Sequence, residues 1–338
     1  MRRTRGAAAG VPREYEQALE RLGSVPRVEL AAHTTPVEEM TRLRDAVGGG
    51  PRLLVKRDDA LPFAFGGNKV RKLEMVAAAA VEAGADTLVT VGGIQSNHAR
   101  VTAATAAKLG LRCVLIANGT PPERPTANAL LDSLLGAEVE YIPSRDERAG
   151  ALRSTMERLR RAGAEPFAIP LGASTPLGAL GFVHAISELL AQTPPPDVIV
   201  HASSSAGTQA GLMAGCALHG LSTRVIGVSA DDPGSDIAAR VHEIVSGIGT
   251  LLGLDGSALA AAAPITVDDR FVGEGYGLAT SASQEAQELA ARMEALFVDH
   301  TYTAKALAAL IAYARTRLIR WGETALFWHT GGQVGIFA

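Results

Sequence analysis

The chain has 338 residues, of which 47% are hydrophobic and 20% carry a charge, and its formal net charge is −3. This composition excludes a disordered chain and fits a globular protein of two modest domains, or one large domain with an insertion. No basic stripe is present, so we expect no nucleic-acid partner. No apolar run reaches the roughly 18 residues that cross a bilayer, so we expect no membrane partner and a cytoplasmic location.

Two cysteines, Cys113 and Cys216, lie within apolar stretches. We therefore predict neither a disulfide framework nor a metal site. The basic start of the chain is followed by Gly6–Gly10, which is no hydrophobic signal core. The first thirty or so residues are interpreted as an N-terminal extension that packs loosely.

From about residue 50, strand-like and helix-like segments alternate. The predicted strands are 87–91, 112–117, 139–142, 166–169, 197–201, 224–229 and 325–329. The predicted helices are 96–108, 126–135, 146–161, 175–191, 208–219, one that begins at Asp236, 281–296 and 303–318. Continuous apolar strands are typical of parallel sheets that helices cover on both faces. The sequence therefore predicts an α/β fold with open twisted sheets.

Ligands of such sheets bind beyond the carboxyl ends of the strands, so the turns there are the first places to search. The first such segment is Gly66-Gly67-Asn68-Lys69, which opens a predicted helix. The positive end of the helix dipole lowers the pKa of a lysine in the first turn, as a lysine that binds a cofactor covalently requires. The alternative is a solvated surface lysine, which is how we interpret Arg71 and Lys72.

The second segment, Gln95-Ser96-Asn97-His98, follows a glycine pair at the end of a strand. Ser96 suits the N-cap of the next helix, whose free amides can bind a carboxylate. The alternative is an ordinary capped turn with a surface histidine.

The third segment is a run of small residues after an apolar strand, made of Ser203, Ser204, Ser205, Ala206, Gly207 and Thr208. Its backbone amides and hydroxyls can surround a phosphate. It matches neither the Walker pattern nor the dinucleotide pattern, which argues against a NAD-binding enzyme. A plain serine-rich loop is the alternative.

The fourth segment is a C-terminal pair: Tyr276 between glycines, and Thr330 before Gly331-Gly332. The flanking glycines indicate a tyrosine ring exposed to a cleft, although a buried structural tyrosine remains an alternative. Thr330 could equally be a hydroxyl that caps a turn.

Together these segments resemble the pyridoxal-phosphate (PLP)-dependent family that contains D-cysteine desulfhydrase and 1-aminocyclopropane-1-carboxylate (ACC) deaminase. The resemblance extends from Leu53 to Gly332 and rests mainly on Gly-Gly-Asn-Lys-x-Arg-Lys-Leu-Glu and Gln-Ser-Asn-His. It implies a tryptophan-synthase-β-like fold (fold type II) of two open twisted, mainly parallel sheets flanked by helices. Residues 1–75 and 185–338 would form the larger, PLP-binding domain and 76–184 the smaller α/β domain, with the active site between them. It also implies a homodimer.

The resemblance assigns roles residue by residue. Lys69 would carry PLP and, with Ser96 and Tyr276, act in catalysis. Asn97 would bond the ring oxygen, Ser203, Ser204, Ser205, Ala206, Gly207 and Thr208 would hold the phosphate, and Thr330 would meet the pyridine nitrogen. The small amino-acid substrate would contact Asn68, Gln95, Ser96, Asn97 and His98.

Departures from the family pattern narrow the activity. Gly275, Thr330 and His98 stand where ACC deaminases carry Glu, Leu and Gln, and all three favour the desulfhydrase branch. Ser204 and Ala206 stand where desulfhydrases usually have glycine. We expect α,β-elimination from a D-cysteine-like amino acid to pyruvate, ammonia and hydrogen sulfide. The alternatives are an ACC deaminase, an L-cysteate sulfo-lyase, or a protein that binds PLP without turnover.

Overall fold

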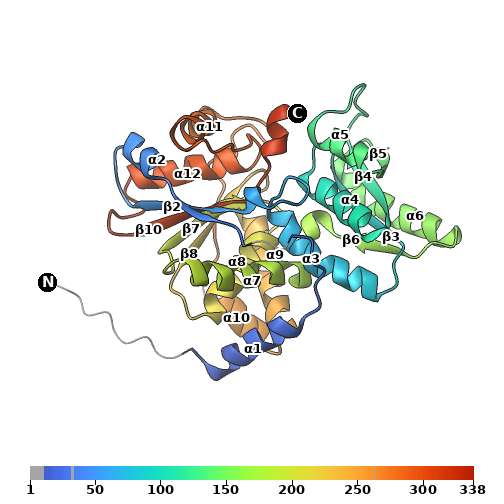
Figure 1. Ribbon diagram of the computed structural model, residues 1–338, viewed down its shortest axis with the longest axis horizontal. Coiled ribbons are helices and arrows are strands. Elements are labelled where there is room, and N and C mark those ends of the chain that lie inside the picture. Colours follow the sequence, from blue (N-terminus) through green and yellow to red (C-terminus); the bar gives the residue numbers. More distant parts are fainter. Residues whose placement is uncertain (1–10, 32–33, 263) are drawn as a thin grey trace.

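The computed structural model describes residues 11–31, 34–262 and 264–338; the basic start of the chain lies outside them. One set of strands comprises β1 (Val37–Glu39), β2 (Arg52–Arg57), β7 (Val198–Ser203), β8 (Arg224–Ser229), β9 (Thr266–Asp268) and β10 (Thr324–His329). Within the described residues these six strands form one sheet in the order β1-β2-β10-β7-β8-β9 (Figure 1). Neighbouring strands run parallel, except that β1 is antiparallel to β2.

A second, smaller sheet lies beside the first and is parallel throughout. It contains β3 (Thr87–Gly93), β4 (Arg112–Asn118), β5 (Glu138–Ile142) and β6 (Pro166–Ile169). The order of these strands is β5-β4-β3-β6. The predicted α/β fold with two open, mainly parallel sheets is confirmed.

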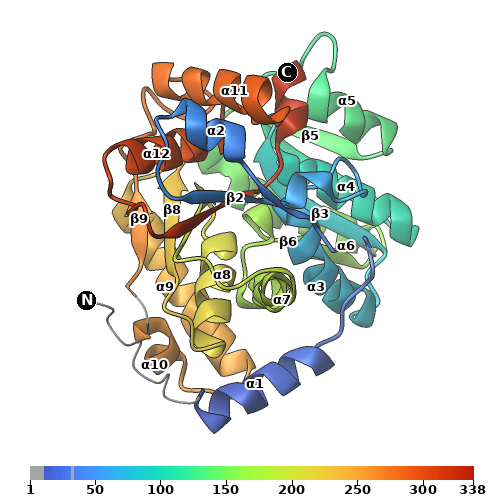
Figure 2. The ribbon, with the colours of Figure 1, turned by 60° about the vertical axis from the view of Figure 1, so that its left-hand side comes forward.

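Helices cover both faces of the larger sheet, because its strands are apolar on both sides. One face packs against α2 (Thr41–Ala46), α11 (Ser281–Glu294) and α12 (Thr303–Arg315). The other packs against α1 (Arg13–Ser24), α7 (Pro176–Gln192), α8 (Gly207–Leu218), α9 (Gly234–Leu251) and α10 (Gly256–Ala261). Figure 2 shows α7, α8 and α9 together below this sheet, with α2, α11 and α12 above it.

The smaller sheet has a similar layered arrangement. Its apolar side chains pack on one face against α3 (Asn68–Glu82) and α4 (Asn97–Leu109), and on the other against α6 (Arg148–Arg161). α5 (Ala127–Leu134) lies beside α4, and short 3₁₀ turns span Asp58–Ala60, Arg145–Glu147, Leu171–Ala173 and Gln333–Phe337.

The predicted strands and helices occur, with ends that differ by at most three residues. The α4 helix shows why the predicted ends agree with the structure. Ser96 is its N-cap and accepts the N–H of Ala99 at 3.2 Å, and Gly110 ends the helix with a left-handed φ of 71°. All four strands of the smaller sheet fall within residues 76–184. The predicted domain boundaries themselves stay a prediction.

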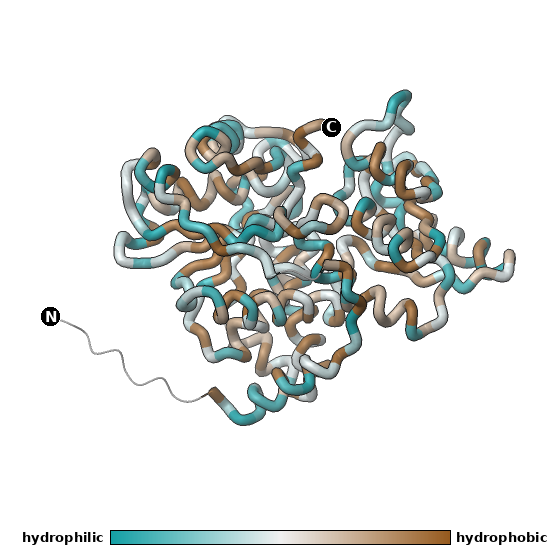
Figure 3. Tube along the Cα trace, viewed as in Figure 1, coloured by the Kyte–Doolittle hydropathy of each residue, from teal (hydrophilic) through white to brown (hydrophobic). Residues whose placement is uncertain are grey.

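The expectation of a loosely packed N-terminal extension is wrong for residues 13–24. These residues form α1, which is mostly hydrophilic in Figure 3. Ala18 and Leu22 nevertheless point into the core, with 0% and 2% of their surface exposed. Arg21 donates to the carbonyl of Leu252 at 2.6 Å. Two apolar residues one turn apart are enough to attach a helix whose other faces are solvated.

Among the described residues, we find no helix with both the length and the apolar character that crossing a membrane requires.

Candidate active site

A cavity of about 540 Å³ opens where carboxyl ends of strands from both sheets meet, a volume typical of small-molecule sites. Most of the predicted site residues line it: Asn68, Lys69, Ser96, Asn97, His98, Ser203, Ser204, Ser205, Ala206, Thr208, Tyr276 and Thr330. Gln95 and Gly207 are not part of its wall. The Gln95 amide instead accepts the N–H of Asn128 at 2.9 Å, beside the cavity.

The turn that leads into α3 lies directly against the end of β10. Gly66 and Gly67 have left-handed φ values of 65° and 102°, and a Cβ on Gly67 would lie 2.9 Å from the carbonyl oxygen of Thr330. The N–H of Asn68 donates to this same oxygen at 3.0 Å. The glycine pair therefore permits a backbone contact that fixes Lys69 relative to Thr330.

Lys69 is half-buried at the start of α3. Loss of hydration lowers the pKa of its amine to about 8, although a hydrogen bond with Lys72 opposes this, and the charge of Arg100 lowers it further. An amine with this pKa is partly neutral near physiological pH. It can therefore act as a nucleophile or as a base.

The interpretation of Arg71 and Lys72 as solvated residues is wrong. Arg71 is 8% exposed and pairs with Asp58 at 2.8 Å, while Lys72 is fully buried. Burial and the neighbouring Lys69 hold the pKa of Lys72 well below its usual value. The sequence did not indicate this burial. The α3 helix packs against α7 as well as against the smaller sheet, so few of its faces meet water.

Lys72 connects α3 to the predicted phosphate loop through Ser174, which the sequence analysis did not single out. The amine of Lys72 donates to Oγ of Ser174 at 3.0 Å, and this oxygen lies 2.8 Å from Oγ of Ser205. The N–H of Gly207 also donates to Ser174, at 3.3 Å. Only the tertiary fold brings Ser174 to this loop, because 31 positions separate it from Ser205.

The loop itself leads into α8 and lines the cavity. Ala206 has a left-handed φ of 70°, a conformation that favours glycine, so the alanine keeps the backbone conformation expected of the family's glycine at a cost in strain. The hydroxyl of Ser203 donates to Gln209 at 2.9 Å. Ser203 thus faces the cavity with its backbone rather than with its hydroxyl.

His98 is a buried wall residue, not a surface histidine, with 2% of its surface exposed. The hydroxyl of Thr90 donates to the carbonyl of Ile169 at 2.7 Å, so it must accept the Nε2–H of His98 at 2.8 Å. Burial, with Lys69 and Lys72 nearby, holds the pKa of His98 well below its usual value. The ring is therefore neutral, and its Nδ1 finds no partner among the described residues.

Tyr276 lines the cavity and is 46% exposed, as the flanking glycines indicated. Its hydroxyl lies 2.5 Å from that of Tyr302, a second cavity residue that the sequence analysis missed. Desolvation raises the pKa of both phenols, so both keep their protons at neutral pH. The pair can therefore donate a proton to a group in the cavity.

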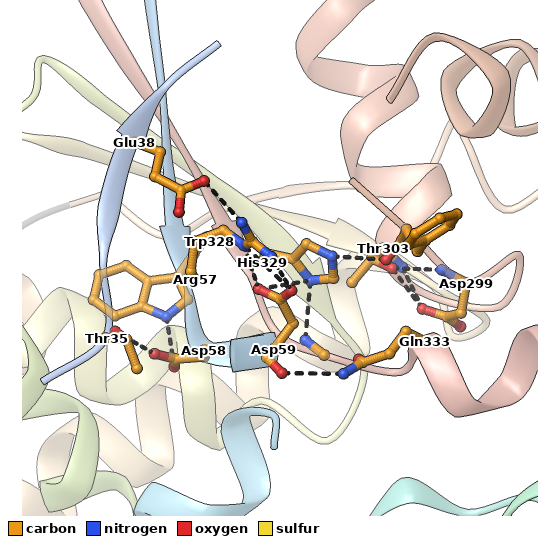
Figure 4. A network of polar contacts seen from close by, with 12 residues as sticks. Thr35, Glu38, Arg57, Asp58, Asp59, Asp299, Thr303, Trp328, His329 and Gln333 are labelled. Atoms are coloured by element: carbon orange, nitrogen blue, oxygen red, sulfur yellow. Dashed lines mark hydrogen bonds and ion pairs between the residues drawn. The ribbon is translucent and has the colours of Figure 1, made fainter. Parts of the chain in front are cut away.

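Polar contacts shape the turn after β10 (Figure 4). The indole of Trp328 donates to Asp58 at 2.8 Å, which ties β10 to the end of β2. Nδ1 of His329 accepts the N–H of Gly331 at 3.2 Å, so its Nε2–H donates to the carbonyl of Phe297 at 2.9 Å. Both ring nitrogens of this buried histidine are used in holding the turn.

Two comparisons with known proteins identify the family of this chain. The model of the pyridoxal-phosphate dependent enzyme family matches residues 28–331. The chain belongs to this family. It is 38% identical to the D-cysteine desulfhydrase of Serratia proteamaculans, over 94% of this chain and 97% of the relative. It is 39% identical to the D-cysteine desulfhydrase of Yersinia enterocolitica over the same shares.

Solved structures of other proteins agree with the fold. The crystal structure of an ACC deaminase homologue superposes with a TM-score of 0.87 at 32% identity, covering 96% of both chains. The processed form of threonine deaminase isoform 2 from Solanum lycopersicum shares the fold, with a TM-score of 0.69 at 17% identity over 96% of this chain and 86% of that one. The predicted family, fold type and cofactor are confirmed.

The side chains around the cavity fit pyridoxal phosphate. Lys72 is a fully buried amine that no carboxylate of the described residues pairs with, which suits the neighbourhood of a phosphate. The described part of the chain contains no group of three or more His, Cys, Asp or Glu side chains suited to a metal ion.

Proposed function

We propose that the protein is a PLP-dependent carbon–sulfur lyase that converts a D-cysteine-like amino acid and water to pyruvate, ammonia and hydrogen sulfide. The observation that carries the proposal is the convergence of Lys69, the Ser203–Thr208 loop and the Tyr276–Tyr302 pair on one cavity. A protein that only bound the cofactor would need neither an amine of lowered pKa nor a protonated hydroxyl pair.

The cofactor site has four parts in this proposal. Lys69 would carry the cofactor, the Ser203–Thr208 loop with Lys72 would hold its phosphate, and Thr330 would meet the ring nitrogen. Asn97 would donate to the ring oxygen. When bound, PLP withdraws the electron pair that is left on the substrate α-carbon after a proton is removed.

The protein's own groups orient the substrate and move the protons. The hydroxyl of Ser96 accepts Ala99 N–H and keeps its own hydrogen for the substrate carboxylate at the N-terminus of α4. Lys69, once free, takes the α-proton, and its pKa of about 8 suits this role. A tyrosine hydroxyl then protonates the departing sulfur.

The substrate choice rests on the relatives and on one cavity residue, Thr330. Both curated relatives described above are D-cysteine desulfhydrases, whereas the structural relative is an ACC deaminase homologue, which makes ACC deamination the second candidate. Thr330 is neutral and cannot enforce a protonated ring nitrogen as a carboxylate would. The weaker electron sink suits loss of hydrosulfide better than opening of a cyclopropane ring.

A pyruvate-release assay tests this proposal with D- and L-cysteine, cysteate, β-chloroalanine and serine, and a 2-oxobutyrate assay tests ACC. We expect kcat/KM for a three-carbon substrate, preferably D-cysteine, to exceed that for ACC by about 100-fold. Comparable turnover of both would contradict the ranking. An absence of turnover with all of them would leave a cofactor-binding protein.

We extend the proposal to the oligomeric state of the protein and to its domain boundaries. The resemblance supports a homodimer, with residues 1–75 and 185–338 as the larger domain and 76–184 as the smaller one. The proposed cytoplasmic location rests on the sequence, which has no long apolar run. Light scattering of the holoenzyme tests the dimer, and limited proteolysis near residues 75 and 185 tests the boundaries.

A further inference from the structure

Lys305 is a buried lysine that the sequence analysis did not single out and the proposed chemistry does not use. It is the third residue of α12, with 1% of its surface exposed. Its amine donates to the carbonyl oxygens of Val272 at 2.8 Å, Gly275 at 2.9 Å and Ala230 at 3.3 Å. A neutral amine has only two N–H groups, so three accepting carbonyls select the protonated ammonium.

The hydrogen bonds of this ammonium go to backbone segments that border the active-site cavity. Burial lowers the pKa of Lys305, although the charges of Asp231 and Asp299 oppose this. Ala230 directly precedes Asp231 and Asp232, which line the cavity. The other two carbonyls belong to the loop that carries Tyr276. Lys305 therefore connects α12 to two parts of the cavity wall, and these bonds offset the cost of burying its charge.

The loop around Tyr276 has weak backbone contacts of its own. The glycines on either side of Tyr276 have φ values of 147° and 77°, which allow many backbone conformations. The backbone N–H groups of Val272 and Leu278 make long hydrogen bonds, of 3.3 Å and 3.4 Å. The bonds from Lys305 are shorter and come from a charged donor, which makes them stronger. Lys305 thus restrains the loop more firmly than the loop's own backbone bonds do.

The start of α12 is a well-anchored support for this contact. Asp299 accepts the N–H of Tyr302 at 2.9 Å and that of Thr303 at 3.0 Å (Figure 4). Tyr302 is itself the N-cap residue of α12, and its hydroxyl lies 2.5 Å from that of Tyr276. One helix end therefore positions both hydroxyls, that of Tyr302 through the backbone and that of Tyr276 through Lys305.

We propose that Lys305 is a positioning residue that fixes the Tyr276 loop, so that the tyrosine hydroxyl can protonate the group that leaves the substrate's β-carbon. The sulfur keeps the electron pair of the broken carbon–sulfur bond and takes the tyrosine proton, which solvent then replaces. Removal of the α-proton by Lys69 does not depend on this loop. The role in proton delivery rests on the proposed lyase function, although the restraint on the loop does not.

Hydrogen exchange of the holoenzyme, followed by mass spectrometry, measures the restraint on the loop. Lys305→Met removes the donors and keeps a long side chain. Amides of residues 271–278 should then exchange roughly 10-fold faster, the factor expected for loss of hydrogen bonds to a charged group, while residues 203–208 keep their rate. Arg315→Met, the same change at the exposed end of α12, is the matched control and should alter neither segment. Unchanged exchange in the loop, or an equal rise in both segments, would overturn the proposal.

The kinetic test compares kcat/KM for D-cysteine with that for β-chloro-D-alanine, because chloride leaves without needing a proton. Lys305→Met should lower the ratio of the two values by at least about 10-fold, since general acid catalysis is lost for one leaving group only. Arg315→Met should keep the ratio. A purely structural role, or loss of the cofactor, would lower both values equally and would refute proton positioning.

A double-mutant cycle shows whether Lys305 acts through Tyr276. Tyr276→Phe should lower the same ratio, and adding Lys305→Met should lower it no further, because both changes remove one hydroxyl from its place. Additive effects would contradict the proposal. Lys305→Gln keeps two N–H donors, should cause a smaller fall, and replaces the methionine variant if that variant does not fold. If exchange changes as expected but no amino acid is turned over, the lyase proposal fails and the restraint on the loop stands.

Discussion

Arg100 donates a hydrogen bond to Oδ1 of Asn97 at 3.1 Å from within the protein interior, where only 1% of its surface is exposed. Nδ2 of Asn128 donates to the same oxygen at 3.0 Å. With two donors on its oxygen, the Asn97 amide is fixed in one orientation, and its own N–H groups remain for the cavity. In the proposed cofactor site, Arg100 would thereby prepare Asn97 as a donor to the ring oxygen.

Replacing Arg100 with methionine should weaken both the fold and the cofactor seat. The change removes hydrogen bonds to Asn97, Asn128 and the carbonyl of Gly66, and leaves buried acceptors without donors. We expect a loss of about 3 kcal/mol in unfolding free energy and roughly 10-fold weaker PLP binding. Urea unfolding measures the free energy, and absorbance titration of the apoprotein measures the PLP affinity. Arg112→Met, on an exposed arginine, should change neither, and a stable variant with unaltered affinity would deny Arg100 this role.

Lys69→Ala should abolish the covalent attachment of the cofactor and all turnover while the protein still folds. Lys69 is half-buried at the edge of the cavity and contributes little to either core. Borohydride reduction of the wild-type holoenzyme followed by peptide mapping identifies the attached lysine. A label on Lys56 or Lys72 would show that the assignment is wrong.

The rate at which the apoprotein takes up PLP should depend on pH through Lys69. The neutral amine is the nucleophile, so the rate should rise with pH and level off above the pKa of about 8 that burial produces. An ordinary lysine, with a pKa near 10.5, would still be gaining rate there. Stopped-flow absorbance between about pH 6 and pH 10 checks this. A rate that keeps rising tenfold per pH unit through this whole range contradicts the lowered pKa.

Thr330→Glu should alter the electronic state of the cofactor and not only its affinity. A carboxylate beside the ring nitrogen favours the protonated ring and makes a stronger electron sink. We expect the absorbance spectrum of the holoenzyme with a slow substrate to gain a long-wavelength band that the wild-type protein lacks. If only PLP affinity falls and the spectra coincide, Thr330 does not meet the ring nitrogen. Thr330→Val, which removes the hydroxyl without adding charge, separates the two effects.

The sequence predicted those features that depend on neighbours along the chain. The capped start of α4 at Ser96 and the glycine pair before Lys69 are local signals, and both occur as expected. The strands were recognisable because burial on both faces leaves continuous apolar runs.

The features that the sequence did not predict depend on contacts between distant segments. Ser174 and Tyr302 have ordinary local surroundings, and only the tertiary fold brings them to Ser205 and Tyr276. Lys72 was misjudged because a charged residue on a helix gives no sign of whether another helix covers it. Its position three residues after Lys69 is a signal that could have been used, since residues so spaced share a helix face.

Because of the contact between Gly67 and the end of β10, the residues proposed to hold the cofactor are positioned independently of other residues that line the same cavity. Because backbone atoms set the spacing between the Gly67 turn and Thr330, side-chain changes elsewhere should leave Lys69 and Thr330, the two proposed anchor points of the cofactor, in register. Asn118 at the end of β4, Arg148 at the start of α6 and Tyr276 in a loop also line the cavity, and none of them takes part in that contact. Engineering of new substrates on this scaffold can therefore vary Asn118 and Arg148 while the proposed placement of the cofactor is kept.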